Sequence, residues 1–149
     1  MILYLDSSAV LSTHLREPAR HEIARSAART AAYLASSPIT FVEIRAGLAR
    51  ARFRENPPRL NDEDYSRAVR ELGADWAEYF QIEISESLIR LAGDLAEKHR
   101  LRAYDALHLA SAVRLRDLAV EDVAISTWDR DLADASRNEG LSLAHEVNG

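Results

Sequence analysis

The stretch Met1-Ile2-Leu3-Tyr4-Leu5-Asp6-Ser7-Ser8, residues 1–8, decides the fold of this chain. Its apolar run, from Ile2 to Leu5, is typical of a strand buried on both faces, as in a parallel sheet. The run ends at Asp6, and the small hydroxylic residues that follow predict a turn. We therefore expect a buried first strand that places Asp6 at its carboxyl end.

Strands and helices alternate along the rest of the chain. Four more segments are candidate strands, at 32–36, 80–84, 123–126 and 142–147. Capping residues and apolar spacing of three and four predict helices between them. These helices start at Pro18, Ser37-Pro38, Asn61 and Ser85, cover 103–115, and run from Asp129 to about Glu139. This alternation predicts an α/β fold with a mainly parallel sheet of four to five strands, covered by helices on both faces.

Composition limits the class of protein. The 149 residues contain 19 Lys and Arg against 24 Asp and Glu, for a formal charge of −5, and we expect one domain over residues 1–149. The absence of cysteine excludes disulfides, thiolate zinc sites and a cysteine nucleophile, and it suits a reducing cytoplasm. No uncharged apolar stretch approaches the ~18 residues of a membrane span, and no signal peptide is evident. We expect a soluble cytoplasmic protein.

Four acids stand out because they follow predicted strands or lie near helix starts with apolar neighbours. They are Asp6, Glu43, Asp105 and Asp129. Carboxylates that converge in a partly buried site need a compensating cation, and hard oxygen ligands select Mg²⁺ or Mn²⁺. Each aspartate could instead cap or begin a helix, and Asp131 is a rival to Asp129. Phosphodiester hydrolysis is the chemistry that such a metal site would support.

Four segments in this order resemble the PIN domain, and within it the VapC-type ribonuclease toxins of bacterial toxin–antitoxin pairs. They are Tyr4-Leu5-Asp6-Ser7-Ser8-Ala9, Val42-Glu43-Ile44, Tyr104-Asp105-Ala106-Leu107-His108-Leu109-Ala110 and Ser126-Thr127-Trp128-Asp129-Arg130-Asp131-Leu132. The resemblance spans nearly the whole chain and implies a three-layer α/β/α fold. It also implies cleavage of single-stranded RNA, homodimerisation and inhibition by a small cognate antitoxin.

The same resemblance implies roles for particular side chains. Asp6, Glu43, Asp105 and Asp129 would form the acidic Mg²⁺ or Mn²⁺ pocket. Ser7, Ser8 and Thr127 would be hydroxyl neighbours of the metal ligands or of water, and Asp131 would be an alternative fourth acid or a ligand of a second metal.

Basic residues near these acids are candidates for an RNA path. Arg45, Arg50 and Arg52 follow Glu43 in the same predicted helix, and arginines beside an acidic pocket could position an RNA backbone. A solvated helix face is the alternative interpretation. Arg102 is a further candidate of the same kind. His108, one helical turn after Asp105, is interpreted as a packing residue, because a metal mechanism needs no histidine base.

Other classes of protein fit less well. A haloacid-dehalogenase-type phosphatase needs a second acid two positions after its nucleophile, where Ser8 stands, and a receiver domain needs a late lysine after a strand, whereas Lys98 falls in a predicted helix. The serious alternative is a non-catalytic, dimeric PIN-like binding module that acts only through its partner.

Overall fold

A parallel five-stranded sheet forms the centre of the computed structural model, which describes residues 1–147. Its strand order is β3-β2-β1-β4-β5, and every neighbouring pair is parallel. The strands are β1 (Ile2–Leu5), β2 (Tyr33–Ser36), β3 (Phe80–Gln81), β4 (Val123–Ser126) and β5 (Ser142–Leu143). The first strand therefore lies at the middle of the sheet, as its continuous apolar run predicts.

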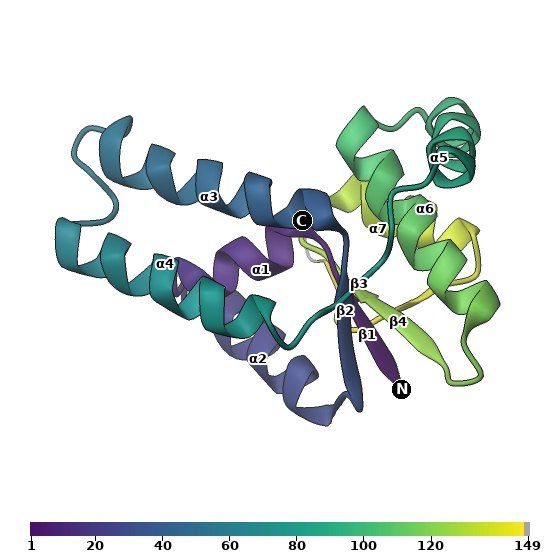
Figure 1. Ribbon diagram of the computed structural model, residues 1–149, viewed down its shortest axis with the longest axis horizontal. Helices are drawn as coiled ribbons and strands as arrows, with labels where there is room; N and C mark the ends of the chain where they lie inside the picture. The colour runs from purple at the N-terminus through teal and green to yellow at the C-terminus, as the bar shows by residue number, and fades with distance from the viewer. Residues whose placement is uncertain (148–149) are drawn as a thin grey trace.

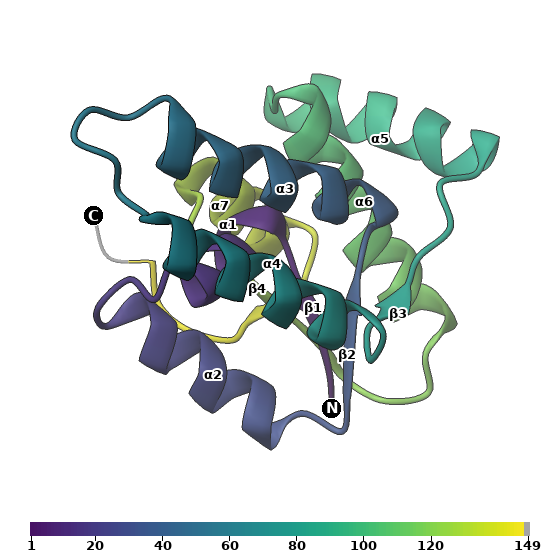
Figure 2. The same ribbon diagram turned by 60° about the vertical axis from the view of Figure 1, so that its left-hand side comes forward.

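Helices cover both faces of the sheet, which gives the predicted three-layer α/β/α fold (Figure 1). The helices on one side are α1 (Ser7–His14), α2 (Arg20–Thr30), α3 (Pro38–Phe53) and α4 (Asp62–Trp76). Those on the other side are α5 (Glu86–His99), α6 (Ala103–Leu118) and α7 (Arg130–Asn138). Helices α3 and α4 run side by side (Figure 2).

Two apolar cores result from this layering. Leu3 and Leu5 of β1 pack with α1, α3 and α4, whereas Tyr4 packs with α5, α6 and α7. Successive side chains of a strand point to opposite faces, so one apolar strand serves both cores. None of the helices within residues 1–147 is long and apolar enough to cross a membrane.

The boundaries of several elements differ from the sequence-based prediction. Only Phe80–Gln81 of the predicted strand 80–84 pairs, since the chain leaves the sheet after Ile82 to reach the Ser85 cap of α5. The predicted strand 142–147 shortens to Ser142–Leu143, and the predicted strand 32–36 starts at Tyr33. After Asp6 the chain forms a helix of eight residues where we expected only a turn.

The helix expected from Pro18 begins two residues later. Ala19 precedes it with a positive φ of 64°, so α2 starts at Arg20. Helix α6 runs beyond the predicted 103–115 and ends at Leu118. The predicted α/β class and parallel sheet are confirmed.

Candidate active site at the carboxyl end of the sheet

Asp6 lies at the carboxyl end of the central strand, beside the end of β4. Its backbone N–H donates to the carbonyl of Ser126, which aligns the two strand ends. The Asp6 side chain caps α1 by accepting from the N–H of Ala9 at 2.9 Å. Thr127 Oγ1 donates to Oδ2 of Asp6 at 2.6 Å, and Ser8 Oγ donates to both carboxylate oxygens at 2.8 and 2.9 Å. These contacts fix the carboxylate in one orientation.

The Asp6 carboxyl is almost fully buried, with 3% of the residue exposed. Burial raises its pKa and outweighs the opposing effects of His108 and of its hydrogen bonds. The folded protein therefore holds a carboxylate in a place that disfavours negative charge. A nearby cation would relieve this cost.

Glu43, in the second turn of α3, meets side chains from α1 and α6. Ser7 Oγ donates to Oε1 of Glu43 at 2.7 Å, and Nε2 of His108 lies 3.0 Å from the same oxygen. Burial raises the pKa of Glu43, but the hydrogen bonds from His108 and Ser7 outweigh it, so the pKa is lowered overall. Glu43 is therefore held as a carboxylate.

Asp105 and Asp129 complete the acidic rim. Asp105 is in the first turn of α6, and Asp129 caps α7 through a 2.8 Å bond from the N–H of Leu132. Burial raises the pKa of Asp105, and the charges of Asp129 and Asp6 raise it further. The guanidinium of Arg102 lies 3.4 Å from Asp105 and 3.6 Å from Asp129. This exposed arginine partly compensates the two acids.

The second-rank candidates separate into two groups. Ser7, Ser8 and Thr127 contact the acids, and Ser8 also accepts the N–H of Trp128 at 2.7 Å. Asp131 is exposed in the first turn of α7, and none of its side-chain contacts within residues 1–147 reaches the other acids. The structure thus favours Asp129 over Asp131 as the fourth acid.

The three candidate arginines of α3 do not act as one group. Arg50 lines a cavity of about 530 Å³ together with Ser7 and Glu43. Arg52 instead bonds to Asp62 at 2.6 Å, and Arg45 lies over the ring of Phe41. Of these three arginines, Arg50 is therefore the one that lines the cavity beside Glu43 and could contact a molecule bound there.

His108 has a contact that spacing along the chain did not predict. The sequence relates it to Asp105, one turn earlier, but its ring bonds to Glu43 and to the buried hydroxyl of Tyr4, 2.9 Å from Nδ1. The residue is buried, but its ring nitrogens contact polar groups, so it does more than fill space in the core. A parallel strand and two helices on opposite sides of the sheet bring these groups together.

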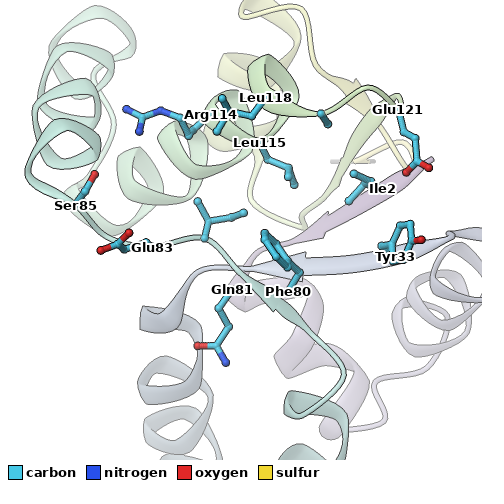
Figure 3. Close-up of a pocket in the computed structure, with 12 residues that line it drawn as sticks. Ile2, Tyr33, Phe80, Gln81, Glu83, Ser85, Arg114, Leu115, Leu118 and Glu121 are labelled. Atoms are coloured by element: carbon cyan, nitrogen blue, oxygen red, sulfur yellow. The ribbon is translucent and has the colours of Figure 1, made fainter.

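Another cavity, of about 600 Å³, lies between the sheet and α6, away from these acids (Figure 3). Ile2, Tyr33 and Phe80, the first residues of three strands, form its floor, and Leu115 and Leu118 of α6 face them. It contains none of the four acids. Because ligands of open parallel sheets bind at the carboxyl ends of the strands, the candidate site is the rim of acids there, of which Glu43 also lines the cavity of about 530 Å³.

The donor set at the acidic rim fits a hard divalent cation. All four side chains offer carboxylate oxygen, the ligand type that Mg²⁺ and Mn²⁺ prefer, and burial penalises the charges of Asp6 and Asp105. Within residues 1–147 no three acid or histidine side chains are already spaced as a formed metal site. Arg102 sits between two of the acids instead.

The PIN domain sequence profile matches residues 3–138, which is most of the chain. The chain belongs to the PIN domain family. Two curated relatives of this PIN protein, Ribonuclease VapC45 and Ribonuclease VapC49 of Mycobacterium tuberculosis, are 32% identical to it over 109 residues. The match covers 73% of this chain and 72% of each relative, and it confirms the predicted family.

Solved structures share the fold of this PIN protein. VapBC2 from Rickettsia felis, bound to a DNA fragment from its promoter, aligns with a TM-score of 0.62 at 16% identity over 96% of this chain and 97% of the other. FitAcB from Neisseria gonorrhoeae aligns with the same score at 17% identity over 96% of both chains. At these identities the likeness concerns the fold.

Proposed function

We propose that this PIN protein is a Mg²⁺- or Mn²⁺-dependent endoribonuclease and the toxin of a toxin–antitoxin pair. The relatives named Ribonuclease VapC support ribonuclease activity. One observation carries the metal assignment: burial raises the pKa of Asp6, and burial together with the charges of Asp129 and Asp6 raises the pKa of Asp105, at the rim where Glu43 also lies. Such a cluster is stable as carboxylates when a cation joins it.

Each acid has a defined support for this role. Thr127 and Ser8 orient Asp6, Ser7 and His108 orient Glu43, and Asp105 and Asp129 face one guanidinium. A divalent ion held there would supply charge stabilisation at the phosphoryl group and would make water a better nucleophile. Because the supporting hydroxyls and the imidazole hold the carboxylate oxygens in place, binding of the ion and substrate requires little rearrangement of Asp6 and Glu43.

The proposed partners are RNA as substrate, a small cognate antitoxin and a second copy of the chain. VapBC2 and FitAcB, the solved neighbours, support an antitoxin partner. The proposed place of action is the cytoplasm.

Cleavage of an RNA pool that contains single-stranded and structured molecules tests the function. Purified antitoxin-free protein should cut RNA with Mg²⁺ or Mn²⁺ and not with EDTA. Asp6→Asn should abolish cutting, because it removes a metal-binding charge while the amide oxygen can still cap α1. Asp94→Asn, which removes an exposed carboxylate of α5 outside the candidate site, is the matched control and should retain cutting. Folded wild-type protein that cuts no RNA with either metal would favour the dimeric binding module.

A further inference from the structure

The cavity of about 530 Å³ beside Glu43 extends the acidic rim along α3. It is lined by Ser7, Glu43, Val42, Arg50, Arg102 and Tyr104, among others. Its volume lies within the range of small-molecule sites in proteins, roughly 300–1,000 Å³. Since Ser7 and Glu43 belong both to this cavity and to the acidic site, a molecule seated in it would touch the proposed cleavage centre.

Tyr104 presents an aromatic ring to solvent at this cavity. It is 56% exposed in the first turn of α6, and Val42 of α3, 62% exposed, lines the same cavity. Within residues 1–147 the Tyr104 hydroxyl makes no hydrogen bond, and its ring contacts no other aromatic ring. An exposed aromatic ring next to an apolar side chain is a surface on which a flat ring can stack.

Arg50 supplies a positive charge two helical turns from Glu43. Seven residues at 1.5 Å each separate them by roughly 10 Å along α3. Both line the cavity, and no acid of the described chain lies within ion-pair distance of the Arg50 guanidinium. An arginine without an acidic partner is free to bind a phosphate. Because Arg50 is this far from Glu43, it could bind a phosphate next to the one that is cleaved, but not the cleaved phosphate itself.

We propose that this cavity binds one nucleotide of single-stranded RNA adjacent to the cleaved phosphodiester, with its base stacked on Tyr104 and a neighbouring phosphate on Arg50. The inference rests on the proposed ribonuclease function and names the form of its substrate. Stacking on Tyr104 requires a base with a free face. Bases in a duplex are stacked on each other, so the subsite selects single strands.

Binding of a fluorescein-labelled, mixed-sequence RNA of ten nucleotides tests the subsite, with fluorescence anisotropy as the readout. The measurement uses the full chain with Asp6→Asn, so that the RNA is not cut. Adding Tyr104→Ala should weaken binding roughly 5- to 100-fold, as expected for the loss of one stacked base, and Tyr104→Phe should restore it. Adding Arg50→Gln should make the slope of log K against log[salt] shallower by about 0.7.

Matched variants control for nonspecific effects of the substitutions. Tyr33→Ala removes another exposed tyrosine, at the opposite end of the sheet, and Arg70→Gln removes an exposed arginine of α4. Both should bind RNA as the Asp6→Asn parent does. A duplex of the same length should bind equally to proteins with Tyr104 and with Tyr104→Ala.

Cleavage by proteins that retain Asp6 separates failure of the subsite from failure of the proposed function. If wild type cuts RNA but Tyr104→Ala changes neither its KM nor the anisotropy result, the subsite is wrong and the ribonuclease stands. If no metal supports cutting but Tyr104→Ala still weakens RNA binding, the subsite stands and the ribonuclease does not. Equal weakening by Tyr33→Ala would also overturn the subsite.

Discussion

The Nε2 atom of His108, on α6, lies 3.0 Å from Oε1 of Glu43, on α3. Ser7 gives its only hydroxyl hydrogen to Glu43, so it can only accept from His108 Nε2, 3.0 Å away. Nε2 must therefore carry a hydrogen, and in the neutral ring Nδ1 accepts from the hydroxyl of Tyr4. Burial raises the pKa of Tyr4 well above its usual range, so this hydroxyl keeps its hydrogen. The core thus sets the tautomer that holds Glu43.

Replacing His108 should release Glu43. His108→Leu leaves the Tyr4 hydroxyl and one side of the carboxylate without a partner, so we expect a loss of about 2 kcal/mol in the free energy of unfolding at pH 7. The pKa of Glu43, lowered by His108 in the wild type, should rise. A lowered acid pKa adds stability that is present above the unfolded pKa and lost as pH falls through the folded one.

Urea unfolding at pH 7 and at acid pH, with a ¹³C NMR titration of Glu43, checks this prediction. Between these two pH values the free energy of unfolding should fall less in His108→Leu than in the wild type. Tyr4→Phe, which keeps the His108 ring, is the matched control and should shift the Glu43 pKa less. An unchanged Glu43 pKa in His108→Leu would contradict the contact.

Removing the charge of Asp105 should not destabilise the metal-free protein. Its pKa is raised, chiefly by burial and then by Asp129. Stability from such a group is full below the unfolded pKa and is lost as pH rises through the folded one, so at pH 7 the charge is a cost. In EDTA at pH 7, Asp105→Asn should therefore unfold at or above the wild-type melting temperature.

Thermal unfolding with EDTA measures the stability of the metal-free protein, and thermal unfolding with Mn²⁺ measures how much the ion stabilises it. Mn²⁺ should stabilise the wild type and Asp94→Asn, an exposed control on α5, more than it stabilises Asp105→Asn. A loss of more than about 1 kcal/mol by Asp105→Asn in EDTA would argue against an unfavourable charge at this position.

Arg102 should compete with a divalent cation for the acidic rim. It pairs with Asp105 and Asp129 but is 84% exposed, so the pairs contribute at most about 1 kcal/mol. Arg102→Gln should therefore tighten Mn²⁺ binding by up to about fivefold. Isothermal titration calorimetry measures this, with Arg90→Gln, which removes a surface pair on α5, as the control. Weaker Mn²⁺ binding in Arg102→Gln would show that the arginine supports the ion.

His14 should make the protein less stable in mild acid. Both its ring nitrogens are buried and, within residues 1–147, lack hydrogen-bond partners, with Asp75 3.5 Å away. Burial lowers the pKa of His14 and outweighs the attraction of Asp75. The unfolded chain therefore binds the proton more tightly, so stability falls as pH drops below about 6.5, by at most about 1.4 kcal/mol per unit.

Urea unfolding of the wild type and His14→Leu at pH 5 and pH 8 isolates this contribution. Between pH 8 and pH 5 the free energy of unfolding should fall less in His14→Leu than in the wild type, because leucine takes up no proton. A difference between the two proteins that is the same at both pH values would contradict the prediction.

Local patterns predicted the helices best and the edge strands worst. The Asn61 and Ser85 caps, with their bonds to the N–H groups of Asp64 and Leu88, lie where the sequence placed helix starts. Pairing at the sheet edges depends on where the chain must turn, so β3 and β5 retain only two residues each. Ile82 and Ile84, which favoured a longer strand at 80–84, pack against the core after the chain leaves the sheet.

The sequence by itself determined the family, the alternation that makes a parallel α/β sheet, and the acids that follow strand ends or begin helices, because those depend on residues close together in the chain. Only the tertiary structure decided that His108 binds Glu43, 65 positions away, that Arg102 faces both Asp105 and Asp129, and that Tyr104 opens onto the cavity of Arg50. Periodicity describes one helix at a time. Which side chains of different helices meet is set by how those helices pack across the sheet.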